Sequence, residues 1–353
     1  MNQWIFKASE ITGLNEARLT ELSPEQEKHI PDYKRALVIA SRSMVPDPIF
    51  SKYFVRGSIG TAGKTMFPAG NIEYGLCAAL HCEETAVAVQ RVTSGKNISG
   101  VPILGFCSKG ESESPPTCCG NCRDVLLDTF GPELEIVAGK PNGGIAVVTK
   151  LAYLLASDFA VYAATDKEYW SHFLSHIVAQ TDGLICDPYA PVDVHPERRY
   201  SACIETEQEL YLGARDIMCD YHPIYAGRDA CRQAIRDSNP FIQRVIIVCE
   251  DPDRRRKMPH VMYKDRQHLL ETNLQAELLQ GHEQDPPVLL FNYYRKTRTK
   301  NRAVVITGAW RTSVKKWLPF PFTAGNFGPE FVEFLTKYYR NRQDLFSKRA
   351  VPQ

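Results

Sequence analysis

The sequence has no excess of charge of either sign. Lys and Arg together number 42, and Asp and Glu number 41, among 353 residues, which gives a formal net charge of +1. Domains that bind nucleic acid broadly usually carry a basic surplus, so this balance argues against that class of protein. Two short basic stretches, residues 254–257 and 295–302, keep a nucleic-acid-binding or editing role open as an alternative, although they also fit solvated loops.

Long apolar runs are lacking as well. No apolar run reaches roughly 18 residues, so we expect no transmembrane helix. Residues 1–7 lack the basic start and the long apolar core of a secretory signal. The 11 cysteines are an odd number, which cannot pair completely within one chain, and the cysteines of intracellular proteins are mostly reduced. We therefore expect a cytoplasmic protein without membrane contact and without a disulfide framework.

One histidine, one glutamate and two cysteines stand out by their spacing. Cys119 and Cys122 are separated by two residues, and upstream of them Glu83 follows two residues after His81. One imidazole and two thiolates form a zinc site with a fourth position open to water. Side chains two apart on a helix point in different directions, so Glu83 is free to move protons at that water. The pattern favours a zinc-dependent hydrolytic deaminase.

Each of these residues also has a structural interpretation. His81 would then be a buried core histidine, and Glu83 an ordinary residue on the surface of a helix. The two cysteines would form a structural zinc site or a redox pair. The presence of the whole set in one chain favours catalysis, and it also argues against a chain that has lost its activity.

Apolar periodicity and turn residues predict a mixed α/β fold with helices packed against one sheet. Both ligand segments fall at helix N-termini, where the unpaired N–H groups favour thiolates over thiols. Residues 16–22 are expected to form a helical turn or two outside the core, and residues 70–73 a polar loop. Helices are expected at residues 33–40, 80–92 and 122–130, and strands at residues 54–61, 65–69, 101–106, 133–138 and 144–148.

The second half of the chain repeats this pattern at an offset of roughly 144 residues. Arg266 falls on Arg123, and Trp317 falls on Leu154 near the end of the first copy. Two unrelated α/β segments aligned by chance remain the alternative. In the register of the repeat, the counterparts of His81, Glu83, Cys119 and Cys122 are Tyr225, Gly227, Met262 and Asp265.

The repeat predicts how the chain is organised. Residues 1–30 would be an N-terminal extension and residues 31–163 the catalytic zinc domain. Residues 164–353 would form a second deaminase-like domain that lacks the metal ligands, so we expect one Zn²⁺ per chain. This second domain would serve packing, oligomerisation and the enclosure of the active site.

The first half resembles the cytidine deaminase family. The resemblance rests on His-x-Glu at residues 81–83, Cys-Gly-x-Cys-Arg at residues 119–123, Gly-Asn-x-Glu at residues 70–73 and Phe-Ser-Lys-Tyr at residues 50–53. It is good over residues 30–160 and weak beyond them. The histidine ligand and the second half are most similar to the long, two-domain, homodimeric members in bacteria and plants. The resemblance implies a homodimer with a three-layer α/β/α fold, present twice, each copy with a mixed sheet of about five strands.

The resemblance also implies roles for individual residues. His81, Cys119 and Cys122 would hold Zn²⁺, and Glu83 would pass a proton from the bound water to the ring nitrogen of the substrate. Arg123 would offset the negative charge of the two sulfurs. The substrate contacts would be Asn71 and Glu73 at the ribose hydroxyls, Tyr53 against the pyrimidine ring, and the main chain of Cys82 and Thr117 at the base edge.

Some of these positions stay open. Asn71 and Glu73 also fit ordinary turn chemistry, and Tyr53 also fits a core aromatic residue. Cys82 and Cys118 replace a small residue and a proline of the family motif, so each either fills space or marks an altered substrate. The sequence favours deamination of free cytidine or deoxycytidine in pyrimidine salvage. The alternative is the same chemistry on a modified nucleoside or another amino- or imino-bearing small molecule in specialised metabolism.

Overall fold

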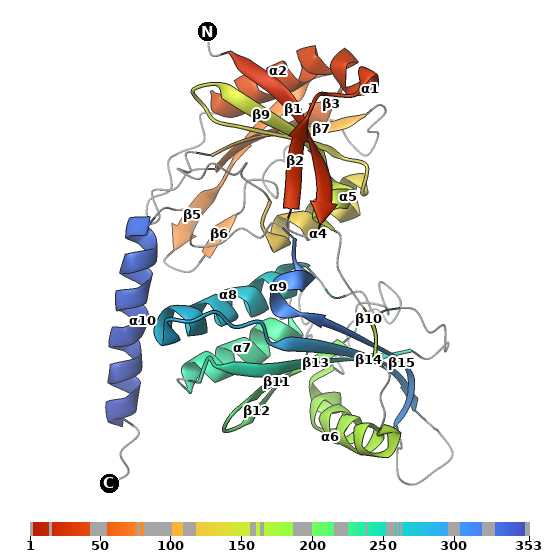
Figure 1. Cartoon of the computed structure of the whole chain (residues 1–353), viewed down its shortest axis with the longest axis vertical. Coiled ribbons are helices and arrows are strands. Elements are labelled where there is room, and N and C mark those ends of the chain that lie inside the picture. The colour runs from red at the N-terminus through yellow and green to blue at the C-terminus, as the bar shows by residue number, and fades with distance from the viewer. Residues whose placement is uncertain are drawn as a thin grey trace. The chain divides into compact units, whose positions relative to one another are not determined.

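The chain forms two compact units (Figure 1). The first unit comprises Met1–Ala156 with Pro319–Glu333, and the second comprises Ser157–Leu318 with Phe334–Gln353. The computed structural model describes the main chain of residues 3–13, 16–42, 55–75, 78–80, 101–108, 118–155, 160–162, 166–185, 200–214, 225–237, 239–251, 258, 261, 263–295, 304–319 and 329–349.

The first unit is built on a mixed sheet. The strands of this unit are β1 (Trp4–Gly13), β2 (Glu16–Thr20), β3 (Val55–Thr61), β4 (Met66–Gly70), β5 (Ile72–Gly75), β6 (Ala78–Leu80), β7 (Pro102–Ser108), β8 (Glu135–Gly139) and β9 (Gly144–Lys150). Seven of them form one sheet in the order β2-β1-β9-β8-β7-β3-β4, while β5 and β6 form a separate hairpin. The pairs β7–β8 and β1–β9 are parallel, and the other neighbours are antiparallel.

Helices cover both faces of this sheet. The helices among the described residues 3–155 are α1 (Pro24–Lys28), α2 (Ile30–Ser41), α4 (Gly120–Phe130) and α5 (Leu151–Leu154). α2 buries a helical stripe that includes Tyr33 and Leu37, and this stripe packs in one core cluster with Ile103 of β7. Leu126 of α4 packs in another cluster with Leu104, the next residue of β7. Consecutive strand residues point to opposite faces, so the predicted three-layer α/β/α arrangement is confirmed.

The second unit repeats the strand plan of the first. Its strands are β10 (Ala160–Val161), β11 (Tyr200–Thr206), β12 (Leu210–Ala214), β13 (Ile242–Glu250), β14 (Pro287–Arg295) and β15 (Val304–Ser313). They lie in the order β10-β15-β14-β13-β11-β12, with only β13 and β14 parallel among these pairs. The run β15-β14-β13-β11-β12 therefore matches β9-β8-β7-β3-β4 in order and in direction. The predicted duplication is present in the topology.

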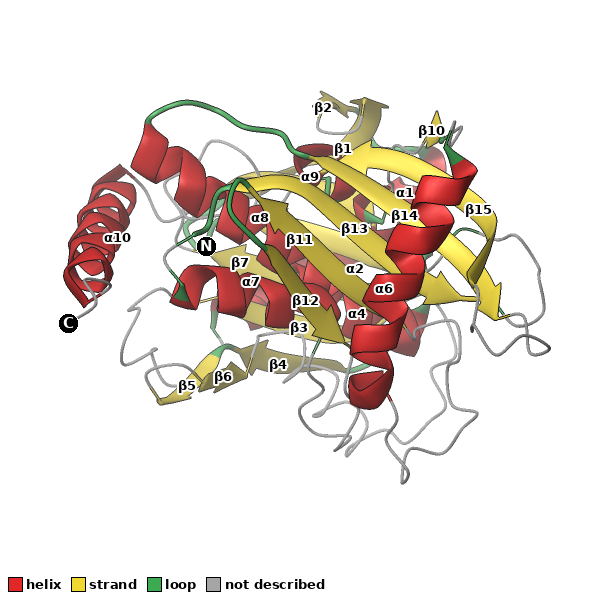
Figure 2. Cartoon of the chain, turned by 90° about the horizontal axis from the view of Figure 1, so that it is seen from below, coloured by secondary structure: helices red, strands yellow, loops and turns green. Residues whose placement is uncertain are grey.

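Helices also lie on both faces of the second sheet. The other described helices are α6 (Lys167–Ile185), α7 (Ala226–Arg236), α8 (Tyr263–Gln280), α9 (Val314–Trp317) and α10 (Pro329–Arg349), of which α10 begins in residues of the first unit. α6 lies across one face, where Trp170 and Leu174 pack against Ile246 and Phe291 (Figure 2). α7 and α8 lie on the other face (Figure 1). Among the described residues, no helix is both long enough and apolar enough to cross a membrane.

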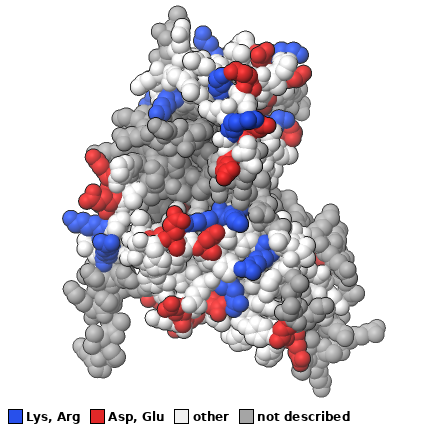
Figure 3. All heavy atoms as spheres, in the orientation of Figure 1, with Lys and Arg blue, Asp and Glu red and all other residues white. Residues whose placement is uncertain are grey.

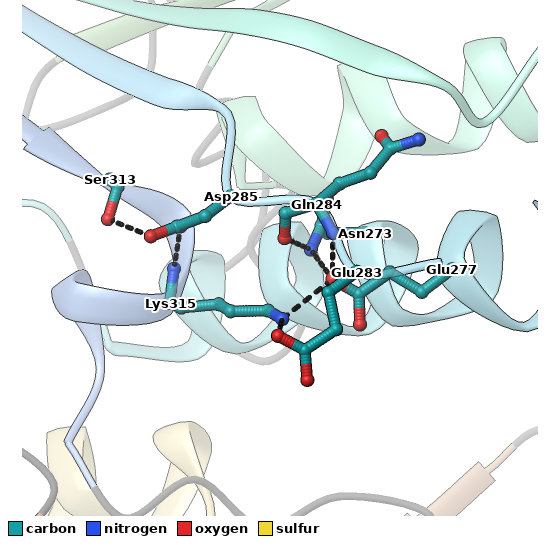
Figure 4. A network of polar contacts seen from close by, with 7 residues as sticks. All are labelled: Asn273, Glu277, Glu283, Gln284, Asp285, Ser313 and Lys315. Atoms are coloured by element: carbon teal, nitrogen blue, oxygen red, sulfur yellow. Dashed lines mark hydrogen bonds and ion pairs between the residues drawn. The ribbon is translucent and has the colours of Figure 1, made fainter. Parts of the chain in front are cut away.

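A polar network fixes the segment that joins α8 to β14 (Figure 4). Asp285 accepts hydrogen bonds from the Ser313 hydroxyl at 2.6 Å and from the main-chain N–H of Lys315 at 2.9 Å. The Lys315 ammonium lies 2.8 Å from Glu277 of α8. These contacts hold the short helix α9 against the end of α8.

Several predicted elements are confirmed. The helices expected at residues 33–40 and 122–130 are α2 and α4, and the five expected strands are β3, β4, β7, β8 and β9. The helix expected at residues 80–92 lies outside the described residues except for residue 80, which ends β6. The expected loop at residues 70–73 is instead the junction where β4 ends and β5 begins.

The N-terminal residues are a correction to the prediction. Helical turns at residues 16–22 are wrong, because residues 16–20 form β2 and pair antiparallel with β1. Helical propensity here is weaker than the sheet hydrogen bonds and the ion pair of Arg18 with Glu10, its direct cross-strand partner. The predicted place outside the core agrees with β2, whose residues 16–19 are exposed, whereas Trp4 and Phe6 of the neighbouring strand β1 pack against the cluster under α2. β1, β2 and β10 also raise the sheets above five strands.

Candidate metal and active site

Cys119 and Cys122 lie together at the start of α4. Cys119 is the N-cap residue, in extended backbone geometry, and Cys122 lies in the first turn. Their Sγ atoms are 3.4 Å apart and form no disulfide. Both sulfurs can therefore lie about 2.3 Å from one zinc ion, the usual Zn–S distance. The positive end of the helix also favours the thiolate form of both side chains.

The other predicted members of the zinc site lie outside the described residues. This holds for His81 and Glu83. Among the residues that the structure describes, no group of three or more His, Cys, Asp or Glu side chains is arranged to hold a metal ion. The structure therefore brings together the two cysteines of the predicted set, and the histidine ligand and the glutamate stay predictions.

Cys118, which precedes the predicted metal-ligand pair, lies in the core. Its side chain is 1% exposed and packs in the same cluster as Cys122 and Leu126. A thiol fits this position because cysteine packs as a small apolar residue. The position of Cys118 thus agrees with the space-filling interpretation of the sequence, whereas Cys82 lies outside the described residues.

Arg123 is fully buried directly after the sulfur pair. Its Nε donates to the carbonyl oxygen of Cys118 at 3.0 Å, and its Nη1 lies 2.7 Å from the carbonyl oxygens of both Leu154 and Pro319. A buried guanidinium is costly unless hydrogen bonds replace its water. Arg123 therefore joins three main-chain segments of the first unit, one of which leads directly into Cys119. Its predicted effect on the charge of the sulfurs stays a prediction.

Arg266 makes a similar set of contacts in the second unit. It is the fourth residue of α8, as Arg123 is of α4. Its Nε donates to the carbonyl oxygen of Val261 at 3.1 Å, and its Nη1 to that of Trp317 at 3.4 Å. Both arginines thus bond the residue five positions earlier and a residue at the end of the short helix after the last common strand. This agreement supports the sequence register of the repeat.

Asn71 is the predicted substrate contact whose side chain the structure describes. It lies between β4 and β5, and its Oδ1 accepts a hydrogen bond from the main-chain N–H of Val55 at 2.8 Å. The main-chain N–H of Asn71 donates to the carbonyl oxygen of Val55 at 3.1 Å. Asn71 therefore fixes the start of β3, which agrees with the turn interpretation. The other predicted contacts are Tyr53, Cys82, Thr117 and the side chain of Glu73, which lie outside the described residues.

Sequence reasoning missed Leu154 and Pro319 as partners of Arg123. Both supply main-chain carbonyl oxygens, which any residue type carries, so no local pattern identifies them. The one usable signal was the recurrence of arginine at Arg266, together with the alignment of Leu154 with Trp317. Recurrence of a charged residue at a helix start indicates a shared buried contact.

The two basic stretches lie almost wholly outside the described residues. Of residues 254–257 and 295–302, the structure describes only the main chain of Arg295, the first residue of the second stretch. On the face seen in Figure 3, the acidic and basic side chains of the described residues are interspersed. A broad interface with a polyanion would gather positive charge on one surface.

Comparison with family models gives no match for this chain, and comparison with curated proteins gives none either. Among solved structures, a cytidine deaminase from Burkholderia pseudomallei is similar, with 22% identity and a TM-score of 0.30 over 36% of this chain and 95% of that one. One from Mycobacterium leprae has 26% identity and a TM-score of 0.26 over 35% and 92%. One from Mycobacterium tuberculosis has 24% identity and a TM-score of 0.28 over 37% and 98%. These structural neighbours are all cytidine deaminases, and at such TM-scores the function proposed below rests on the residues of this chain.

Proposed function

We propose that the chain is a zinc-dependent hydrolase of a C–N bond, which converts free cytidine or deoxycytidine to uridine or deoxyuridine and releases ammonia. The observation that carries the proposal is the sulfur pair of Cys119 and Cys122, 3.4 Å apart at a helix start. His81 and Glu83 complete the set in the sequence. A structural zinc site uses four protein ligands, whereas this set offers three and leaves a position for water.

His81, Cys119 and Cys122 would hold the ion. Bound zinc lowers the pKa of a coordinated water towards neutrality. Glu83 would accept the proton of that water and donate it to the ring nitrogen beside the carbon that bears the amino group. The water oxygen would join that carbon, and Glu83 would then pass the second proton of the same water to the amino group, which would leave as ammonia. Arg123, through the carbonyl of Cys118, would keep the turn before Cys119 in place.

The remaining predicted residues would bind the nucleoside. Asn71 and Glu73 would bond the ribose hydroxyls, and the hydrogen bond from the Val55 N–H would hold the Asn71 side chain in place. Tyr53 would stack on the pyrimidine ring. The main-chain N–H of Cys82 and the carbonyl of Thr117 would contact the base edge.

The second copy would have a supporting role. We assign the zinc chemistry to residues 31–163, and to residues 164–353 a domain without metal ligands, which gives one zinc per chain. A cytoplasmic homodimer that works in pyrimidine salvage is the assembly that we propose. The mismatch at all three ligand positions supports this assignment, because Tyr225, Met262 and Asp265 stand there.

Ammonia release from a panel of substrates tests the proposal. The panel comprises cytidine, deoxycytidine, base-modified cytidines, cytidine monophosphate and a cytosine-containing oligonucleotide, each with the full chain loaded with zinc. We expect the highest kcat/KM for a free, unmodified nucleoside. A large preference for a modified nucleoside would support the alternative in specialised metabolism, and turnover of the oligonucleotide would support an editing enzyme. No ammonia from any of them would contradict the proposal.

A further inference from the structure

The second unit carries a buried acidic residue at the start of α8. Asp265 is the third residue of this helix and is 0% exposed. Its Oδ2 accepts a hydrogen bond from the main-chain N–H of Gly227 at 3.0 Å, and its Oδ1 accepts one from the N–H of Arg228 at 2.7 Å. Both N–H groups belong to the first turn of α7. One carboxylate therefore links the starts of two helices.

This contact supplies the N-terminal cap of α7 from another helix. The N-cap residue is Tyr225, whose side chain does not cap the helix. The first N–H groups of a helix have no acceptor within the helix, and they carry its partial positive charge. Asp265 satisfies two of them and brings a negative charge to that end, which makes both hydrogen bonds charge-assisted.

Gly227 leaves the space that the carboxylate occupies. A Cβ atom at this position would lie 2.8 Å from Oδ1 and 3.0 Å from Cγ of Asp265. Real Cβ atoms essentially never lie this close to another heavy atom, so any residue larger than glycine would displace the carboxylate from the helix. In the register of the repeat, Gly227 stands at the position of Glu83. Gly227, which stands where the first copy has Glu83, is therefore the residue that leaves room for the Asp265 carboxylate.

The energetic balance explains why the contact needs all of its donors. Burial raises the pKa of the Asp265 carboxyl, and the N–H of Gly227, the side chain of Tyr200, the N–H of Arg228 and the charge of His268 act in the opposite direction. A buried carboxylate is tolerated only when hydrogen bonds replace its water. Loss of either carboxylate oxygen as an acceptor would remove this partner from an N–H group in the first turn of α7.

Asp265 occupies the place of Cys122 in the repeat. Each is the third residue of its helix, and each is followed by the arginine that bonds the residue five positions earlier. Under the proposed function, a metal ion joins Cys122 to His81, whose counterpart Tyr225 is the N-cap residue of α7. In the second unit, the residue at the same place reaches α7 directly.

We propose that Asp265 and Gly227 form a metal-independent lock in the second unit. The carboxylate takes the structural place of a metal bridge and fills the N-terminus of α7, so that this site receives neither zinc nor a nucleoside. The comparison with a metal bridge rests on the function proposed for the first unit, whereas the lock itself involves residues of the second unit alone.

Amide hydrogen exchange of the full chain tests the lock. Asp265→Asn keeps the shape of the side chain but replaces one acceptor by an NH₂ group that opposes an N–H donor. We expect the amides of Gly227 and Arg228 to exchange at least about tenfold faster, with the amides of β13 unchanged. The control is Asp237→Asn, at the exposed end of α7. Equal exchange at both amides in the two variants would overturn the lock.

A double-mutant cycle tests the role of Gly227. Gly227→Ala should lower the denaturant midpoint markedly in the natural chain, because its Cβ meets the carboxylate. In an Asp265→Ala background the same change should have a much smaller effect, since nothing is displaced. Equal effects in both backgrounds would show that Gly227 does not make room for Asp265, and would overturn the pairing.

Chelation of zinc separates the lock from the proposed function. With the metal removed, the amides of Gly227 and Arg228 should keep their exchange rates, while the amide of Arg123 in α4 should exchange faster. Faster exchange at Gly227 and Arg228 would overturn the metal independence of the lock. Unchanged exchange at Arg123 would contradict the zinc site and leave the lock supported.

Discussion

The Nη1 atom of Arg123 lies 2.7 Å from the carbonyl oxygen of Pro319, which is 196 residues further along the chain. Pro319 belongs to the returning segment of the first unit, so this hydrogen bond holds that segment beside α4. The same guanidinium also bonds Cys118 and Leu154. The single buried side chain of Arg123 thus connects the residue before the cysteine pair with two distant segments of main chain.

Arg123→Lys should destabilise the protein. A lysine ammonium cannot reproduce the planar fork that reaches three carbonyl oxygens, so the variant should lose about 2–4 kcal/mol of unfolding free energy. Urea denaturation measures the loss. Arg236→Lys is the matched control, because its exposed ion pair with Asp237 should contribute less than about 0.5 kcal/mol. Equal midpoints for the two variants would show that the buried contacts of Arg123 carry no stability.

Cys119→Ser and Cys122→Ser should each lower the bound zinc from one per chain towards zero, since a hydroxyl is a poor substitute for a thiolate ligand. Elemental analysis of the purified chain measures this. Cys107→Ala is the control and should keep its zinc. Burial raises the pKa of the Cys107 thiol to about 12, so this residue stays protonated near neutral pH. Retention of zinc by Cys122→Ser, or close to two zinc ions in the natural chain, would contradict the single site.

Glu83→Gln should abolish most turnover while zinc stays bound. The amide cannot carry the proton from water to the ring nitrogen, so we expect kcat to fall by about 10²- to 10⁴-fold. Ammonia release and zinc content are measured on the same preparation. Glu133→Gln, at an exposed ion pair with Lys150, should behave as the natural chain does. Activity that survives Glu83→Gln would remove this residue from proton transfer.

Gly105→Ala should cost about 1–3 kcal/mol of stability by overpacking. A Cβ there would lie 2.7 Å from the main-chain carbon of Ala36 and 2.7 Å from the hydroxyl of Ser58, so α2 would have to move away from β7. Gly139→Ala is the comparison, because its Cβ would lie 3.2 Å from the flexible Leu37 side chain and should cost less. Thermal unfolding ranks the two, and the reverse order would contradict the close packing of α2.

The contribution of Tyr33 to the stability of the fold should decrease at alkaline pH. Burial, and then the charge of Glu135, raise the pKa of the Tyr33 hydroxyl, which donates to Glu135 at 2.9 Å. The folded pKa lies above the unfolded value, so this stability is fully present below about pH 10 and is lost above it. Tyr33→Phe should cost about 1–2 kcal/mol at pH 8, and the gap to the natural chain should narrow at pH 10.5. Urea denaturation measures the difference in unfolding free energy between the two chains. An equal difference at both pH values would contradict this linkage.

The sequence by itself determined the elements with strong local patterns. β3, β7, β8 and β9 alternate or run apolar between turn residues, and α2 carries its buried side chains at helical spacing. The Cys-x-x-Cys spacing placed two sulfurs on one helix start, because residues three apart lie on the same face. The repeat placed Arg266 on Arg123. All of these depend on neighbours along the chain.

Tertiary structure decided whatever depends on distant partners. Residues 16–20 became a strand because β1 offers a ladder of hydrogen bonds, although their composition favours a helix. The carbonyl partners of Arg123 and the close approach of Asp265 to Gly227 join residues far apart in sequence. Main-chain N–H and C=O groups occur at nearly every position and carry no residue-specific signal, so only the packed fold shows which of them a buried charge reaches.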